Sequence, residues 1–261
     1  MTGTEPRVLR RDQDGVATLT LNRPQQRNAL DRATIAELHD ALNKIAGDAS
    51  VRVVVLAANG PAFCSGHDLK ELRANTEPTF YEAVFGACSA MMLALVKLPQ
   101  PVIARVHAMA TAAGCQLVAS CDLAIAADGA KFATPGVNIG LFCSTPMVAV
   151  SRNLPRKHVM EMLLTGDAMD AATAARLGLV NRAVPAAELD REIERIAALI
   201  VARSPLTLKI GKEAFYRQLE MGQAEAYDYA SAVMARNMAT RDAAEGIDAF
   251  LAKRQPTWCG A

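Results

Sequence analysis

Residues 101–126 read PVIARVHAMATAAGCQLVASCDLAIA, and this stretch decides the fold. Pro101 starts a strand directly after a proline-bounded helix end. A turn of small residues over 108–114 then leads into a helix that ends near Ser120, and a further strand follows over 123–126. This close succession of strand, helix and strand indicates an α/β fold.

The segments before this stretch have the same alternating character. Residues 15–21 alternate apolar and polar side chains, as a half-buried strand does, and residues 51–56 have the β-branched, apolar character of a buried strand. Between them lies a helix that Asp31 caps and Gly47 ends. Its apolar face consists of Ile35, Leu38, Leu42 and Ile45. Residues 80–98 repeat this helical spacing, so the N-terminal half is predicted to alternate strands and helices.

The C-terminal third is predicted to be helical. Ser204 followed by Pro205 is a well-formed helix start. Four helices are expected, over 187–203, 205–219, 223–239 and 241–252. We therefore predict an α/β body over residues 1–203 and a helical region over 204–261, whose apolar rows a region of that size could not bury alone.

Composition excludes several classes of protein. The chain has 261 residues, of which 51% are hydrophobic, and its 28 Lys+Arg against 27 Asp+Glu give a net charge of +1. This is the profile of a globular protein, with no electrostatic reason to bind nucleic acid or a membrane surface. The clearest unbroken aliphatic stretch, 196–202, is far shorter than the ~20 residues of a membrane helix.

The cysteines bear on the compartment. There are six of them, at positions 64, 88, 115, 121, 143 and 259, with no CxxC pair and no Cys/His spacing of the zinc type. They indicate free thiols in a reducing compartment, and no metal site is expected. The N-terminus, MTGTEPRVLRR, lacks the apolar core of a secretory signal, so we expect a cytoplasmic protein.

Five collinear segments carry a family resemblance. They are NRPQQRNAL (22–30), AFCSGHDLKEL (62–72), PVIARVHAMATAAGCQLVASCDLAIA (101–126), FATPGVNIGL (132–141) and LLTGDAMDAATAARLGLVNRAVP (163–185). In this order and spacing the chain resembles the enoyl-CoA hydratase/isomerase (crotonase) family. The resemblance implies a crotonase (ClpP-like) spiral of ββα units and a C-terminal helical trimerisation region. It also implies homotrimers or hexamers and acyl-CoA thioester ligands, with no tightly bound cofactor and coenzyme A entering as part of the substrate.

Thioester chemistry of this kind passes through an enolate-like oxyanion, which needs N–H donors placed where the charge develops. By resemblance, the backbone N–H groups of Ser65 and Ala113 form this oxyanion hole. The neighbouring Gly66 and Gly114 would let the backbone approach the substrate closely.

The positions that carry acids in the family differ here. Family hydratases have two glutamates where this chain has Gln116 and Gly136, and some isomerases and dehalogenases have an aspartate where it has Ser144. An amide cannot exchange a proton near neutral pH and glycine has no side chain. The chain therefore looks like the enoyl-CoA hydratase domain-containing branch that lacks the catalytic glutamates.

Other residues are candidates for parts of the chemistry. His67 could titrate near neutrality and act as a base. Cys143 and Ser144 are expected to line the acyl pocket, and without a nearby base neither is favoured as a nucleophile. The phosphates of coenzyme A would attract cations, for which the candidates are Arg23, Arg27 and Lys70.

Two functions remain open from the sequence. One is an enzyme of fatty acid or acyl-CoA metabolism, nominally an enoyl-CoA hydratase/isomerase with an atypical base. The other is a non-catalytic acyl-CoA-binding homo-oligomer. A serine peptidase on the related ClpP-like fold lacks a fitting Ser/His/Asp constellation. If the pocket lacked only its acids, Gln116→Glu combined with Gly136→Glu would be expected to restore hydration.

Overall fold

The computed structural model describes residues 5–261 and contains two sheets. The larger one has the strand order β1-β2-β3-β4-β6-β9. Its strands are β1 (Val8–Gln13), β2 (Val16–Leu21), β3 (Val53–Ala58), β4 (Val102–Val106), β6 (Leu123–Ala127) and β9 (Arg182–Val184). The smaller sheet has the order β5-β7-β8, with β5 (Ala110–Thr111), β7 (Lys131–Ala133) and β8 (Met169–Asp170). In the larger sheet β1 pairs antiparallel with β2 and the remaining pairs are parallel, so each parallel neighbour is reached by a crossover.

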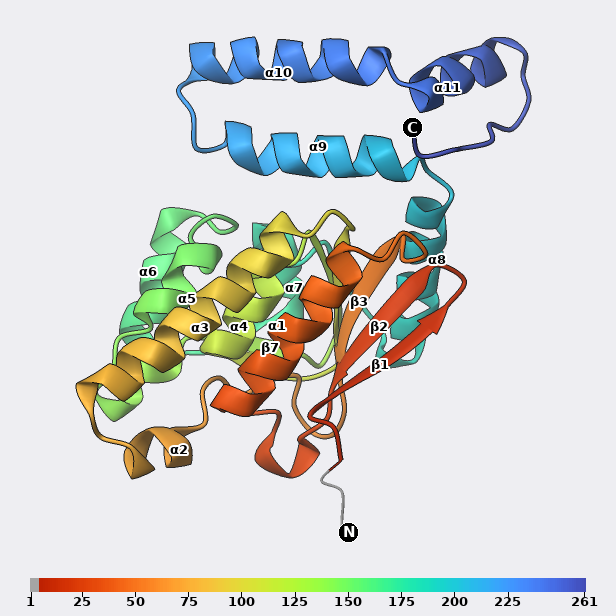
Figure 1. Cartoon of the computed structure of the whole chain (residues 1–261). Coiled ribbons are helices and arrows are strands. Elements are labelled where there is room, and N and C mark those ends of the chain that lie inside the picture. Colours follow the sequence, from red (N-terminus) through yellow and green to blue (C-terminus); the bar gives the residue numbers. More distant parts are fainter. Residues whose placement is uncertain (1–4) are drawn as a thin grey trace.

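Helices surround the larger sheet (Figure 1). In the body they are α1 (Arg32–Ala46), α2 (Leu69–Ala74), α3 (Pro78–Lys97), α4 (Ala113–Ser120), α5 (Ser144–Val150), α6 (Arg156–Thr165), α7 (Ala171–Leu177) and α8 (Leu189–Val201). Three short 3₁₀ turns accompany them, η1 (Pro24–Gln26), η2 (Pro135–Ile139) and η3 (Ala186–Glu188). The C-terminal helices are α9 (Pro205–Gln218), α10 (Gln223–Met238) and α11 (Arg241–Leu251).

The sheet is buried on both faces, which explains its β-branched strands. All six residues of β3 are buried. Val54 and Leu56 pack into the main core with α1 and α3, whereas Val53 and Val55 pack with α8 in a second cluster. The alternation of β2 predicted from the sequence is confirmed, since Ala17, Leu19 and Leu21 are fully buried. The site described below therefore rests on a rigid, two-sided core.

Local signals in the sequence also placed several helices correctly. Asp31 caps α1 by accepting the Thr34 N–H at 2.8 Å, and all four predicted apolar residues of that helix are buried. Ser204 caps α9 through the Thr207 N–H at 3.1 Å. These confirmed predictions share a local cause: a polar side chain satisfies the free N–H groups of the first helical turn.

The sequence analysis missed β1, α5, α6 and the three strands of the small sheet. β1 reads VLRRDQ, and five of its six residues are exposed. It pairs with β2 along the edge of the sheet with no apolar alternation. The short strands of the small sheet have too few residues to show a period.

Helix α3 corrects the expectation about membrane-length segments. Among the described residues it is the helix that is long and apolar enough to cross a membrane, with a mean hydropathy of 1.6 over 18 of its residues. The expectation that no segment reaches this length is therefore wrong. One such helix is weak evidence for a membrane, because core helices pass the same test. Val84, Cys88 and Leu95 of α3 are buried in the main core.

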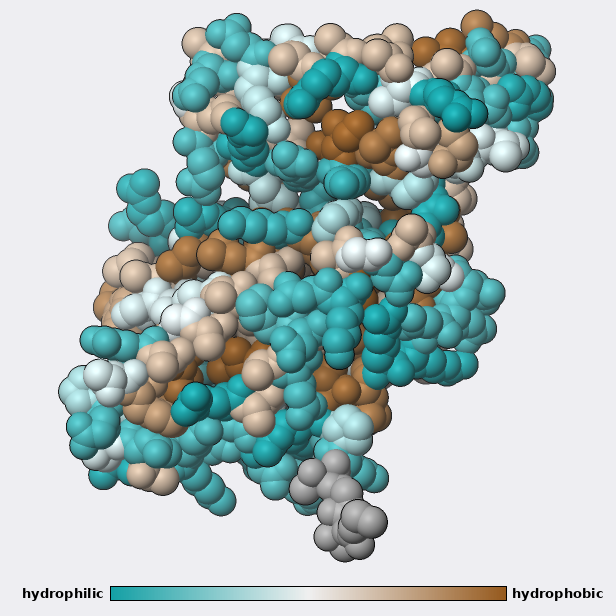
Figure 2. Space-filling view, in the orientation of Figure 1, coloured by the Kyte–Doolittle hydropathy of each residue, from teal (hydrophilic) through white to brown (hydrophobic). Residues whose placement is uncertain are grey.

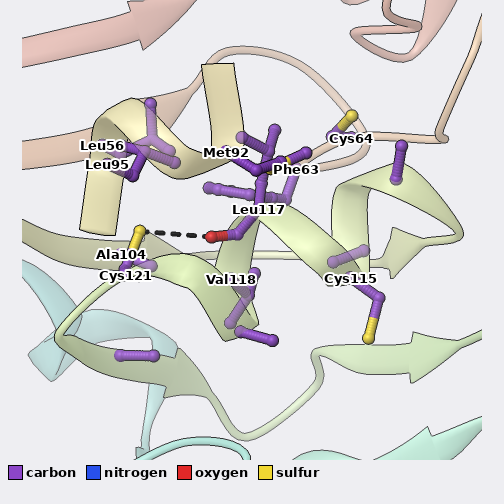
Figure 3. Packing of buried hydrophobic residues seen from close by; sticks show 14 of the residues in the cluster. Leu56, Phe63, Cys64, Met92, Leu95, Ala104, Cys115, Leu117, Val118 and Cys121 are labelled. Atoms are coloured by element: carbon purple, nitrogen blue, oxygen red, sulfur yellow. Dashed lines mark hydrogen bonds between the residues drawn. The ribbon is translucent and has the colours of Figure 1, made fainter. Parts of the chain in front are cut away.

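The tight packing around α4 is visible in Figure 3. Leu117 and Val118 lie among Phe63, Met92 and Leu95 from other elements, and all are buried. Cys121 donates through its thiol to the Leu117 carbonyl oxygen at 3.3 Å.

Most of the cysteines are deeply buried free thiols. The buried ones are Cys64, Cys88, Cys115, Cys121 and Cys143, whereas Cys259 is exposed. Burial raises the pKa of Cys64, Cys88 and Cys115 to about 12. These thiols are therefore protonated in the folded chain and serve as apolar packing groups.

Helices α9, α10 and α11 form a layer beyond the body (Figure 1). Figure 2 shows apolar surface on this layer and on the edge of the body beneath it. Large apolar side chains remain exposed on the layer, namely Phe215, Leu219, Tyr227, Met234, Met238, Phe250 and Leu251. Such a surface is unusual for a chain without a partner.

A buried polar cluster ties α9 to the body. The Lys212 ammonium donates to Asp122 Oδ2 at 2.6 Å and to the carbonyl oxygens of Leu95 and Gln100 at 3.0 and 3.1 Å. The Tyr216 hydroxyl donates to the other oxygen of Asp122 at 2.9 Å. With only 7% of the Lys212 side chain exposed, this cluster is well shielded from solvent.

Candidate functional site

Two chain segments run side by side at the N-terminus of α4. Residues 64 and 110 form a parallel bridge, and the Thr111 N–H donates to the Cys64 carbonyl oxygen at 2.9 Å. A Cβ atom at position 114 would overlap that same carbonyl oxygen and come within 2.8 Å of the Cys64 Cβ. Gly114 is therefore required for α4 to pack this closely against the segment.

Gly66 brings the first segment against the turn that opens α4. Its φ is +88°, and an added Cβ would lie 2.9 Å from the Ala112 Cβ and 3.4 Å from the Ala113 nitrogen. Ala112 itself has a φ of 50° and a ψ of −118°, a conformation that L-residues rarely adopt. Strained backbone of this kind is often found at functional sites.

The hydrogen bonds correct one of the two predicted N–H donors. The Ser65 N–H donates to the Arg27 carbonyl oxygen at 3.1 Å, so it is already engaged. On either side of His67, the Gly66 carbonyl oxygen accepts from the Leu30 N–H at 2.8 Å and the Asp68 N–H donates to the Leu30 carbonyl oxygen at 3.0 Å. Peptide groups alternate in direction along an extended chain, so the His67 N–H faces away from Leu30.

The N–H groups of His67 and Ala113 are free. Within residues 5–261, no backbone or side-chain acceptor takes a hydrogen bond from either. Ala113 is the first residue of α4, whose first-turn N–H groups have no partner within the helix. The sequence analysis placed the first donor two residues too early. The signal available was Gly66, which precedes His67 and allows the close approach.

Gln116 lies one turn along α4 and is 4% exposed. Its Oε1 atom has no hydrogen-bond partner among the described residues. Unpaired buried oxygens are rare and costly in folded proteins, which indicates that something outside the chain completes this one.

Space is closed at Gly136. An added Cβ would lie 2.7 Å from the Leu141 carbonyl oxygen and 2.9 Å from the Cys143 Sγ. The Leu141 N–H donates back to the Gly136 carbonyl oxygen at 2.9 Å, so the loop folds onto the glycine. This removes the condition on which restored hydration by Gln116→Glu with Gly136→Glu depends, because the loop fills the place of the second glutamate.

Gly136→Glu is expected to lower the free energy of unfolding by about 2–3 kcal/mol, because the new Cβ meets a backbone oxygen that cannot rotate away. Urea unfolding measures the change. Gly129→Glu is the matched control, since a Cβ there meets nothing within 4 Å. A Gly136→Glu chain as stable as this control would contradict the geometry.

His67 does not have the properties predicted for a base near neutrality. Burial lowers the pKa of its imidazole from an ordinary 6.5 to about 4. The ring packs edge-on against Phe85 at 5.0 Å between centroids, and Nε2 is buried without a partner in the described chain. As pH falls from 6.5 toward 4, the unfolded chain takes up a proton at His67 that the folded chain does not, so stability declines over that interval.

Neither Cys143 nor Ser144 has the surroundings of a nucleophile. Burial raises the pKa of the Cys143 thiol. The Ser144 hydroxyl is exposed, and its partner in the described structure is the Phe142 carbonyl oxygen at 3.3 Å. Neither group has a base beside it that would activate it.

Of the three predicted cations, the structure ties one down. Arg23 lies 3.2 Å from both Asp31 and Asp68, with 15% of its side chain exposed, so it serves to hold the site segment to α1. Arg27 and Lys70 are exposed and have no carboxylate partner within residues 5–261. Both flank the segment that carries His67.

No group of three His, Cys, Asp or Glu side chains in the described part of the chain could hold a metal ion. The candidate site is thus a pair of free N–H groups in neutral, largely buried surroundings.

Comparison with known proteins agrees with this geometry. Residues 11–261 match the family model described as enoyl-CoA hydratase/isomerase. The chain is 45% identical over 256 residues to rat enoyl-CoA hydratase domain-containing protein 3, mitochondrial, which spans 98% of this chain and 85% of that protein. The human protein of the same name is 46% identical and the match covers 98% and 84% of the two chains.

Solved structures match over nearly the whole chain. An enoyl-CoA hydratase from Mycobacterium smegmatis is 55% identical with a TM-score of 0.96, covering 97% of this chain and 99% of that one. Human enoyl Coenzyme A hydratase domain-containing protein 3 is 45% identical with a TM-score of 0.95, covering 97% and 100%. The predicted crotonase α/β fold is confirmed.

The same comparisons overturn the expected cytoplasmic location. The rat and human relatives are named as mitochondrial proteins. The expectation was wrong because free thiols indicate a reducing compartment without separating one such compartment from another.

The fold, the two glycine-dependent segments around α4 and the match over residues 11–261 lead to one conclusion: this chain belongs to the enoyl-CoA hydratase/isomerase family.

Proposed function

We propose that the chain binds acyl-CoA thioesters with the thioester oxygen held by the N–H groups of His67 and Ala113. The observation that carries this proposal is that both N–H groups are free while the segments that bear them lie in contact. Two such donors stabilise negative charge on an oxygen, and α4 adds the favourable partial charge of its N-terminus.

Proton transfer is the missing part of the chemistry. At the positions where family hydratases carry glutamates, this chain has Gln116 and Gly136, and His67 is neutral at physiological pH. We infer an acyl-CoA binding site of the hydratase type in which hydration is slow. A non-catalytic acyl-CoA-binding homo-oligomer is the second candidate, favoured by the loop that fills the space at Gly136.

Arg27 and Lys70 are proposed to bind the phosphates of coenzyme A, because they are the free cations beside the His67 segment. Calorimetric titration with butyryl-CoA tests both the ligand and this role. Arg27→Gln combined with Lys70→Gln is expected to weaken binding about tenfold at low salt, whereas Lys44→Gln, an exposed lysine of α1, is expected to leave it unchanged. Failure of the unaltered chain to bind any acyl-CoA would reject the proposed function.

The region 204–261 is proposed to be an oligomerisation region attached to a core of residues 1–203. The exposed apolar side chains of α9, α10 and α11 support this, because a second copy of the chain would bury them. A trimer or a hexamer is expected by light scattering at micromolar concentration. A monomer under those conditions would contradict the proposal.

A further inference from the structure

Two buried oxygens without partners come from separate elements beside the proposed oxyanion site. One is Oε1 of Gln116, which is 4% exposed, and the other is Oγ1 of Thr134, which is fully buried. Neither has a hydrogen-bond partner in the described structure. Leaving a buried polar atom unpaired costs about 1–3 kcal/mol, so two of them in one region suggest a missing ligand group.

The backbone links both residues to the same turn. The Gln116 N–H donates to the Ala112 carbonyl oxygen at 3.0 Å, and the Ala112 N–H donates to the Ala133 carbonyl oxygen at 2.9 Å. Thr134 directly follows Ala133 at the end of β7, where β7 pairs in parallel with β5. Gln116 and Thr134 therefore flank the turn whose next residue, Ala113, offers its free N–H.

The chemistry of the two oxygens is complementary to a hydroxyl group. An amide oxygen only accepts hydrogen bonds, whereas a threonine hydroxyl can also donate. A ligand hydroxyl could donate to Gln116 Oε1 and accept from the Thr134 hydroxyl, which would satisfy both. A carboxylate would find no cation here, since the neighbouring His67 is held neutral by burial.

We propose that Gln116 and Thr134 form a neutral socket for a hydroxyl group on the acyl chain, so that the preferred ligand is a hydroxyacyl thioester. This rests on the proposed function, because it presupposes that a thioester binds at His67 and Ala113. It assigns Gln116 to the recognition of a substituent where the family position would carry a proton-transferring acid.

The test compares the dissociation constants of 3-hydroxybutyryl-CoA, butyryl-CoA and succinyl-CoA under one set of conditions. The hydroxylated ligand is expected to bind at least about tenfold more tightly than the other two, since each hydrogen bond made contributes to affinity and each left unmade costs. Equal affinity for 3-hydroxybutyryl-CoA and butyryl-CoA would overturn the socket and leave the proposed function standing. Binding of none of the three would reject both.

Two near-isosteric variants locate the preference. Gln116→Met and Thr134→Val are each expected to bring the ratio of the two affinities close to one, without weakening butyryl-CoA. The controls Gln223→Met and Thr207→Val, at exposed positions of α10 and α9, are expected to keep the ratio. A ratio unchanged in both socket variants would overturn the proposal. If either variant fails to fold, the ligand comparison on the unaltered chain still decides.

Discussion

Crotonyl-CoA is expected to be hydrated by this chain at least about 10³-fold more slowly than by a family member with two catalytic glutamates. Each lost acid–base group costs about 10²–10⁴ in rate, and the positions concerned hold Gln116 and Gly136. His67 cannot compensate, because its pKa of about 4 makes it a weak base. The loss of enoyl-thioester absorbance gives the rate.

A two-glutamate hydratase assayed in parallel, at the same pH and salt, provides the reference rate. The binding measurement with butyryl-CoA must show that the site is occupied, so that slow turnover reflects chemistry rather than lack of substrate. Hydration within tenfold of the reference would reject the absence of a proton-transferring group and require one that the geometry does not reveal.

Lys212→Met is expected to lower the free energy of unfolding by about 3–5 kcal/mol, since it leaves Asp122 buried without its cation. The ammonium also loses its bonds to the carbonyl oxygens of Leu95 and Gln100, which no methionine can replace. Urea unfolding gives the free energy. Because the cluster joins α9 to the body, limited proteolysis after residue 204 should accelerate as well.

Lys209→Met is the matched control for this substitution. It lies on the same helix, one turn away, and its side chain is exposed. We expect its effect to stay within about 0.5 kcal/mol. A Lys212→Met chain as stable as this control would show that the buried pair contributes little to holding the C-terminal helices on the body.

Features set by local chemistry could be predicted from the sequence. Asp31 and Ser204 cap their helices as expected, and the four apolar residues of α1 face the core. Both follow from contacts within one or two helical turns. β1 could not be predicted in this way, because its pairing with β2 is a property of the sheet edge and leaves no pattern in VLRRDQ.

The site was predicted in part. Gly66 and Gly114 correctly marked the place where two segments approach closely, because only glycine fits there. Ser65 was wrong as a donor, since the direction of each N–H depends on the bridge to Leu30, which lies far away in sequence. The closure of the loop onto Gly136 depends on Leu141 and Cys143, and no local signal reveals it.

The buried thiols give this chain a built-in reporter of its own opening. Cys64, Cys88 and Cys115 are protonated and shielded in the folded state, while Cys259 is exposed. An alkylating reagent should therefore modify one site rapidly and the deep sites only in molecules that have unfolded. Cys143, under the loop that closes on Gly136, would become reactive when that loop alone opens. Mass spectrometry of a labelling time course would thus separate local from global opening without introducing any probe.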